Sequence, residues 1–351
     1  MAVYTTIDDP SAYFQTKIFT GDGNDNRAIT NDGNSDLQPD WIWFKNRSTT
    51  NSHNVLDSTR GVGKVLEGTN STSAEGDTST RLTSFNSDGF TVRTDPSVNG
   101  DGNGIVAWQW KANGGSRTTF TESGDNPGGG RQVNTTAGFG IYDYTGTGGA
   151  GTIAHGLGAT PKWVLIKDRG NAEHWIVATT QIDGSRDGIY LETTGAKFDL
   201  SSSNELIFDS TNITLSDDWV DTNGDARNYI MYAFTPIQGY SKFGSYTGNG
   251  NVDGTFVHTG FSPAWVIVKR TDSGNNWHMH DNKRVPHNSN NKTLYANLSN
   301  TEGTEDFDML SNGFKLRESG GGYNASGGTY IYMAFAESPL VTSKGVPTTA
   351  R

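Results

Sequence analysis

Residues 39–45 (PDWIWFK) contain a short pattern, Pro-x-Trp followed by three apolar residues and a lysine. The same pattern returns at residues 161–167 (PKWVLIK) and at residues 263–269 (PAWVIVK). Copies that are about a hundred residues apart are too distant for the units of a solenoid and match the size of a small domain. The chain is therefore predicted to contain three tandem repeats of one domain.

Other landmarks recur around each copy in the same order. An aromatic-Thr-Gly-x-Gly turn precedes each copy, at residues 19–23, 144–148 and 246–250. Each repeat closes on an apolar strand whose Ala lies 66, 70 and 69 residues after the motif Trp. An Asp-x-x-Arg element lies between these landmarks, and its three copies are Asp57 and Arg60, Asp183 and Arg186, and Asp281 and Arg284.

The composition predicts an all-β chain. Of 351 residues, 45 are Gly, and the hydrophobic share of 32% is concentrated in runs of four to seven residues rich in Val, Ile and aromatic types. Such runs favour β-strands joined by polar loops, and no long run with a helical apolar period lacks Gly. We predict three tandem β-sandwiches of the jelly-roll or concanavalin-like kind, with little helix. The motif Lys is predicted to lie at the end of the sheet with its ammonium group in water.

The landmarks divide the chain into six segments. The Gly-rich stretch between the first two repeats is predicted to be a linker, with a long surface loop as the alternative, and no strand longer than residues 117–121 is expected in it. The short second junction predicts that repeats 2 and 3 pack rigidly, whereas repeat 1 is free to hinge. The segments are an N-terminal arm (1–11), repeat 1 (12–111), the linker or loop (112–137), repeat 2 (138–237), repeat 3 (238–337) and a C-terminal tail (338–351).

Charge and cysteine content exclude several classes of protein. A net charge of −11 argues against nucleic-acid binding, which needs a basic face. The chain has no Cys, so it has neither a disulfide framework nor a thiolate metal site. The sequence shows no recognisable signal peptide and no apolar run long enough to span a membrane. This combination is typical of a protein made in a host cytoplasm and released by lysis, as virion parts are.

Aromatic residues at a repeated position are the first candidates for a binding site. His53, Trp175 and Trp277 each lie twelve residues after a motif Trp, in polar surroundings. A core position and a contact surface for glycan or protein both remain open for them. The motif tryptophans themselves are predicted to be core residues. Arg284, like the other arginines of the Asp-x-x-Arg elements, either recognises a carboxylated sugar or braces a turn against its Asp.

Metal and catalytic sites find little support. His278 and His280 alternate and share one face of a strand, which is a metal-ligand spacing only if a third ligand is nearby. The chain has no nucleophile elbow, zincin motif or phosphate loop. We predict no enzyme activity, no cofactor and no bound metal.

Five stretches carry a resemblance to a known family. They are residues 40–47 (DWIWFKNR), 82–90 (LTSFNSDGF), 106–111 (VAWQWK), 332–337 (YMAFAE) and 344–351 (KGVPTTAR). Together they resemble structural proteins of marine tailed phages, notably cyanophages. The resemblance covers almost the whole chain and implies a virion component, without assigning binding residues.

These observations lead to a predicted function. The leading hypothesis is a tail-fibre or receptor-binding protein of a bacteriophage virion, which contacts host-surface polysaccharide and forms a homo-oligomer, with a trimer favoured. The alternative is a capsid decoration, head-fibre or tail adaptor protein that binds only other virion proteins. Neither hypothesis involves nucleic acid or insertion into a membrane.

Overall fold

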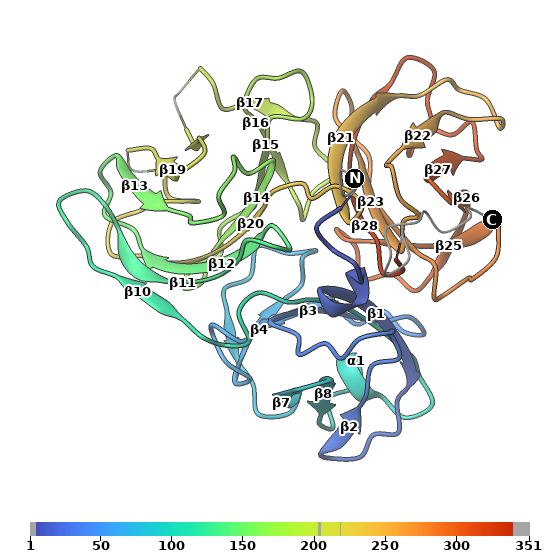
Figure 1. Ribbon diagram of the computed structural model, residues 1–351, viewed down its shortest axis with the longest axis horizontal. Coiled ribbons are helices and arrows are strands. Elements are labelled where there is room, and N and C mark those ends of the chain that lie inside the picture. The colour runs from blue at the N-terminus through green and yellow to red at the C-terminus, as the bar shows by residue number, and fades with distance from the viewer. Residues whose placement is uncertain (1–4, 203–204, 218, 340–351) are drawn as a thin grey trace.

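The computed structural model is an all-β protein of three lobes around a common centre (Figure 1). It describes residues 5–202, 205–217 and 219–339; the start of the predicted arm and residues 340–351 of the predicted tail lie outside these ranges. The two helical segments are η1 (Pro10–Ala12) and α1 (Pro96–Asn99). In the described part of the chain, no helix is long and apolar enough to cross a bilayer. The predicted all-β class and scarcity of helix are confirmed.

Lobe 1 (residues 14–110) and lobe 2 (residues 118–234) each contain a large and a small antiparallel sheet. The strands of lobe 1 are β1 (Phe14–Thr20), β2 (Arg27–Ile29), β3 (Trp41–Asn46), β4 (Asn54–Asp57), β5 (Lys64–Glu67), β6 (Gly76–Asp77), β7 (Leu82–Asn86), β8 (Gly89–Val92) and β9 (Gly104–Trp110). The strands of lobe 2 are β10 (Thr118–Phe120), β11 (Gly128–Asn134), β12 (Phe139–Thr145), β13 (Gly151–Ala154), β14 (Trp163–Asp168), β15 (Trp175–Thr179), β16 (Asp187–Tyr190), β17 (Phe198–Asp199), β18 (Ile207–Phe208), β19 (Asn212–Leu215) and β20 (Asn228–Phe234).

Lobe 3 (residues 241–335) is built on one continuous sheet that curls over itself. Its strands are β21 (Ser241–Thr247), β22 (Phe256–His258), β23 (Trp265–Arg270), β24 (Trp277–Asp281), β25 (Asn290–Tyr295), β26 (Gly303–Leu310), β27 (Gly313–Leu316) and β28 (Thr329–Phe335).

The strand order around the motif is the same in the three lobes. The sheets read β1-β9-β3-β4, β12-β20-β14-β15 and β21-β28-β23-β24, so the motif strand always lies between the closing strand and the strand that follows it in sequence. The register also matches, because Trp41 pairs with Trp110, Trp163 with Phe234 and Trp265 with Phe335. Side chains at matching register positions in the three lobes are compared below as corresponding residues.

Each motif strand buries both of its faces. In β3, Trp41 and Trp43 point into a central core that all three lobes share, while Ile42 and Phe44 point into a core within lobe 1. The strands β14 and β23 divide their side chains in the same way between the central core and their own lobe. Burial on both faces is the reason why the motif is apolar at consecutive positions instead of alternating.

The motif lysines are buried, which corrects the prediction that their ammonium groups lie in water. Lys45, Lys167 and Lys269 are 0% exposed. Lys167 Nζ donates to the carbonyls of Asp168 and Asn171, at 2.8 and 3.1 Å. The chain turns over the end of each motif strand, so backbone carbonyls replace water as the partners of the ammonium group. Burial lowers the pKa of each of the three lysines to about 8.

The Gly-rich segment at residues 112–137 is part of the fold. Its strand β11 is seven residues long and pairs along its whole length with β12, and β10 pairs with β11. The expectation of no strand longer than residues 117–121 is therefore wrong. Gly allows this strand because Gly129 lies against β12 so closely that a Cβ there would be 2.0 Å from the Asp143 carbonyl oxygen.

Lobe 1 is also tied to its neighbours, in contrast to the predicted hinge. Glu75 of lobe 1 forms an ion pair with Arg169 of lobe 2, at 2.9 Å. Arg47 of lobe 1 forms an ion pair with Glu302 of lobe 3, at 2.6 Å. Backbone hydrogen bonds accompany both pairs, from Glu75 N–H to the Arg169 carbonyl and from Glu302 N–H to the Arg47 carbonyl.

Candidate functional site

The aromatic candidates at the repeated position are core residues. Trp175, Trp277 and His53 are 1%, 0% and 0% exposed. Trp277 Nε1 donates across the lobe boundary to the Tyr190 carbonyl, at 3.1 Å. The contact-surface alternative for these residues is therefore wrong, and the core alternative is right. Most of their polar sequence neighbours lie in the loops before the strands, whereas the rings themselves belong to the central core.

His53 shows how a polar ring is accommodated in this core. Trp43 Nε1 donates to His53 Nδ1 at 2.8 Å, and His53 Nε2 lies 3.0 Å from the Tyr295 carbonyl of lobe 3. These partners select the neutral tautomer with its proton on Nε2. Burial, assisted by the positive charge of Lys45, lowers the pKa of His53 to about 3. The residue joins two lobes and cannot reach an external ligand.

Arg284 is likewise internal. Its Nε contacts Asp281 Oδ2 at 2.5 Å, and its guanidinium lies 5.8 Å from the centre of the Trp108 ring of lobe 1. Asp281 also accepts a hydrogen bond from Trp108 Nε1, at 3.0 Å. The predicted turn brace is present here and the sugar-recognition alternative is wrong.

The other two Asp-x-x-Arg elements differ from each other. Arg60 and Asp57 form the same brace in lobe 1, where Asp57 also accepts from the Tyr232 hydroxyl of lobe 2. In lobe 2, Asp183 is half-exposed and pairs with Lys197 instead of Arg186. The brace is therefore a feature of two lobe boundaries, not of every lobe.

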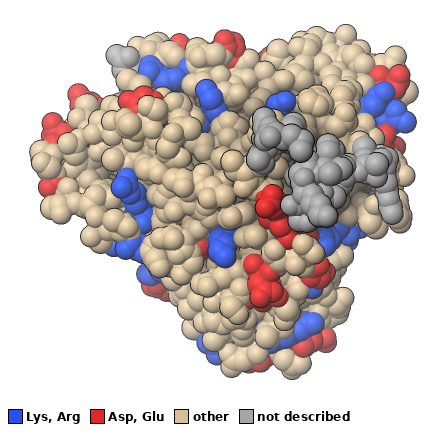
Figure 2. Space-filling model, viewed as in Figure 1, with Lys and Arg blue, Asp and Glu red and all other residues tan. Residues whose placement is uncertain are grey.

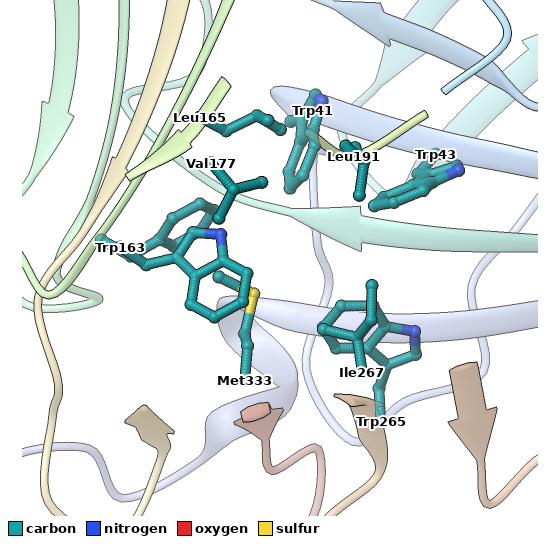
Figure 3. A pocket seen from close by; sticks show the side chains of 10 residues that line it. Trp41, Trp43, Trp163, Leu165, Val177, Leu191, Trp265, Ile267 and Met333 are labelled. Carbon is teal, nitrogen blue, oxygen red and sulfur yellow. The ribbon is translucent and has the colours of Figure 1, made fainter. Parts of the chain in front are cut away.

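The centre of the molecule is closed to ligands. The three motif tryptophans meet there (Figure 3), and Trp110 lies 5.4 Å from Trp265 across a lobe boundary. A cavity of about 20 Å³ remains between the lobes. Its lining is apolar and comprises Trp41, Trp43, Trp163, Leu165, Val177, Leu191, Phe234, Trp265, Ile267 and Met333. A void of this size has room for about one water molecule but offers it no polar partner, so it is a packing defect and not a binding site.

The paired histidines are engaged with protein groups. His278 Nδ1 lies 2.6 Å from Glu305 Oε2, and the His280 ring stacks on Phe307 with centroids 4.3 Å apart. Burial holds the pKa of His280 well below its usual range, so that ring is neutral. Within the described residues, no three His, Asp or Glu side chains are grouped to hold a metal ion.

The best candidate for an external site is the outer face of lobe 3. Among the described residues, only three large apolar side chains are exposed: Val220 in lobe 2, and Val252 and Phe256 in lobe 3, which are 64% and 44% exposed. Phe256 lies on the edge strand β22, opposite Lys315 of β27. Lys315 in turn contacts Asp253, which is next to Val252. An exposed phenyl ring thus lies close to charged and apolar neighbours.

A shallow hollow of about 500 Å³ lies beside these residues. It is lined by Val252, Asp253, Ser289, Asp306 and Arg317. Arg317 reaches Asp253 at 3.4 Å, and the Ser289 hydroxyl donates to Asp306 at 2.9 Å. The ammonium group of Lys315 lowers the pKa of Asp253, so this carboxylate is ionised at neutral pH. The hollow therefore offers a hydroxyl, carboxylates and a guanidinium at the surface.

Phe256 is specific to lobe 3. The strand β22 pairs with β27 as β2 pairs with β8 in lobe 1 and β13 with β19 in lobe 2. At the corresponding ladder positions, lobe 1 has Ala28 and lobe 2 has Thr152. Both alternatives are small, so the exposed ring is not required by the fold. The shared sequence pattern does not reveal Phe256, because this is a position at which the three lobes differ.

The face of the molecule in Figure 2 shows no large patch of one charge among the described residues. On the face in Figure 2, acidic and basic side chains alternate in small groups among uncharged residues.

Comparison with known proteins places the chain in a family. A family model described as "Domain of unknown function (DUF7483)" matches residues 9–339. The chain belongs to this family. The match covers all three lobes in one stretch, in keeping with their shared core. No curated protein and no solved structure matches the chain.

Proposed function

We propose that the protein is a structural component of a bacteriophage virion, in which three lectin-like β-sandwich units form a receptor-binding or tail-fibre module that contacts host-surface glycan. The resemblance to marine tailed-phage proteins supports the virion assignment. The exposed Phe256 beside the polar hollow of lobe 3 is the observation that supports a glycan contact. An aromatic ring packs against the C–H face of a sugar ring, and carboxylates, hydroxyls and guanidinium groups bind its hydroxyls.

Three further points belong to this proposal. The protein is made in the host cytoplasm and leaves the cell by lysis as part of the virion. A homo-oligomer, with a trimer favoured, stays a prediction. No catalytic role is proposed, since the polar groups of the hollow are engaged in ion pairs and hydrogen bonds with one another.

The test measures binding of the purified protein to host cells, to phage capsids that lack it and to isolated tails. Phe256→Ala is expected to lower binding to cells about tenfold, because it removes a central exposed aromatic contact. Thr152→Ala, at the corresponding ladder position of lobe 2, is the matched control and is expected to bind like the wild type. Thermal unfolding of both variants checks that neither substitution perturbs the fold.

Two other outcomes of the binding experiment would change the proposal. Unchanged cell binding by Phe256→Ala removes the outer face of lobe 3 from the proposal. Binding to capsids or tails alone, with none to cells, replaces receptor binding by a decoration or adaptor role, which the exposed Val252 and Phe256 also suit.

A further inference from the structure

Lobe 2 contains a cluster of aromatic and acidic side chains around His174. The His174 ring stacks on Tyr190 with centroids 3.9 Å apart, and His174 Nδ1 is in hydrogen-bond contact with Glu192. Asp221 accepts hydrogen bonds from the His174 backbone N–H at 3.0 Å and from Trp219 Nε1 at 3.1 Å. His174 is 39% exposed at its side chain, so the cluster reaches the surface.

The residues of lobe 3 that correspond to Glu192 and His174 are uncharged amides. Glu192 accepts the Trp175 backbone N–H, and in lobe 3 Asn297 accepts the Trp277 backbone N–H in the same way. Asn297 donates to Asn276 at 2.9 Å. In lobe 2 the corresponding pair is Glu192 with His174. An amide pair is therefore sufficient for the fold at this place. The charges in lobe 2 need another explanation.

The tyrosines at matching positions also differ. Tyr190 pairs with Ile176 as Tyr295 pairs with His278. The Tyr295 hydroxyl donates to Glu305 at 3.1 Å. Among the described residues, no group is hydrogen-bonded to the Tyr190 hydroxyl, although the negative charges of Asp221 and Glu192 act on it.

The cluster has more negative than positive charge. The side chain of Glu192 is 4% exposed and Asp221 is 6% exposed, so both carboxylates are more than nine-tenths buried. In the described chain, Asp221 forms no ion pair with Lys or Arg, and Arg227 is engaged by Asp168 and Glu173. The buried ammonium group of Lys167 acts on both carboxylates through its charge, but its hydrogen bonds go to the carbonyls of Asp168 and Asn171. The single ammonium group of Lys167 does not balance two buried carboxylates, and such an excess of buried negative charge is costly unless a further cation arrives.

From this juxtaposition we propose that the cluster of His174, Tyr190, Glu192, Trp219 and Asp221 binds a primary ammonium group. The carboxylates neutralise its charge, the free Tyr190 hydroxyl accepts one of its N–H groups, and the aromatic rings add a cation–π contribution. The ammonium group belongs either to an amino sugar or to a lysine side chain. This proposal does not rest on the glycan contact of lobe 3, since it concerns another lobe and other residues.

The experiment follows the indole N–H resonance of Trp219 by NMR, assigned with Trp219→Phe. The probes are two matched pairs: glucosamine with its neutral N-acetyl form, and Nα-acetyl-lysine amide with its norleucine analogue. We expect at least one ammonium probe to shift the resonance while its neutral partner does not. Response to the sugar or to the lysine compound identifies the source of the group, and either response supports the site.

Two variants sharpen the test. Asp221→Asn is expected to weaken binding at least about tenfold, since one of the two carboxylates that neutralise the ammonium group is lost. The double variant His174→Asn with Glu192→Asn reproduces the neutral pair of lobe 3 and is expected to fold and to lose binding. Equal shifts by charged and neutral probes, the absence of any shift, or full binding by a folded double variant would each overturn the proposal.

Discussion

Three buried lysines are the most unusual residues of this protein. Lys45, Lys167 and Lys269 are the penultimate residues of the three motif strands, and each donates only to backbone carbonyls. The second carbonyl bound by Lys269 is that of Thr194 in lobe 2, so this lysine also joins two lobes. A lysine provides several donors at once at a place where strand ends leave carbonyls without partners.

These lysines predict a stability that rises with alkaline pH. Their pKa is about 8 in the folded state and about 10.4 in the unfolded chain, so the unfolded state binds more protons between these values. The cost of burying the charges is fully present below pH 8 and is relieved as the pH rises. Each lysine contributes at most about 1.4 kcal/mol per pH unit to the free energy of unfolding.

Urea unfolding from about pH 7.5 to 9.5 measures this slope. Lys167→Met is expected to reduce it by about a third, because one of the three titrating groups is lost. Lys64→Met, at a lysine whose side chain is 40% exposed, serves as the control and should leave the slope unchanged. A flat profile in the wild type would contradict the prediction. Above about pH 10 the trend reverses, since burial raises the pKa of tyrosines such as Tyr229 and the unfolded chain then loses protons first.

At the scale of elements, the Thr-Gly-x-Gly turns are held by a buried asparagine that the repeat pattern did not single out. In lobe 3, Asn324 donates to Asn249 Oδ1 and to the carbonyls of Asn251 and Glu318, at 2.7–3.0 Å, and accepts the Asn249 N–H. A Cβ on Gly248 would lie 2.3 Å from the Ala325 carbonyl oxygen, so glycine is required where the turn meets this segment. The corresponding asparagines of lobes 1 and 2 are Asn99 and Asn223.

Asn324→Ala is expected to destabilise the protein by about 2–3 kcal/mol, because it leaves several buried partners unsatisfied. Denaturant unfolding measures the change. Asn300→Ala, at an exposed loop position, should lie within about 0.5 kcal/mol of the wild type. Equal stabilities of the two variants would show that the turn does not depend on its asparagine.

At the scale of the whole molecule, the central core decides how the lobes behave. Trp41 of lobe 1 stacks on Tyr232 of lobe 2 at 4.7 Å, and Trp163 of lobe 2 meets Trp277 of lobe 3 at 6.0 Å. No lobe can separate without exposing its motif tryptophan. The lobes are therefore expected to be one cooperative unit.

Calorimetry tests this expectation through the ratio of calorimetric to van't Hoff enthalpy. A single transition with a ratio near one is expected, where three independent domains would give a ratio well above one. A chain that begins after residue 111 provides a second measurement. This shorter chain lacks the aromatic residues of lobe 1 at the centre. Its near-ultraviolet circular dichroism spectrum is therefore expected to differ from that of the native protein. A native spectrum for that shorter chain would show that lobes 2 and 3 are independent of lobe 1.

The sequence by itself determined the all-β class and the position of the motif strands, because a β-strand buried on both faces needs apolar residues in succession, and this requirement is local. The sequence did not determine whether the polar residues of the repeated pattern are exposed or buried. Lys45 and His53 are of residue types that are usually exposed, yet both are buried. Backbone carbonyls and neighbouring rings from other segments replace water around them.

Only the tertiary structure decided which aromatic rings are at the surface. Trp175 and Trp277 have polar neighbours in sequence but face the shared core, whereas Phe256 is followed by the apolar Val257 and remains exposed. Exposure depends on which faces of the lobes meet, and that depends on contacts between segments a hundred or more residues apart. Sequence periodicity identifies the two faces of a strand, but only the packing of the three lobes determines which face is covered.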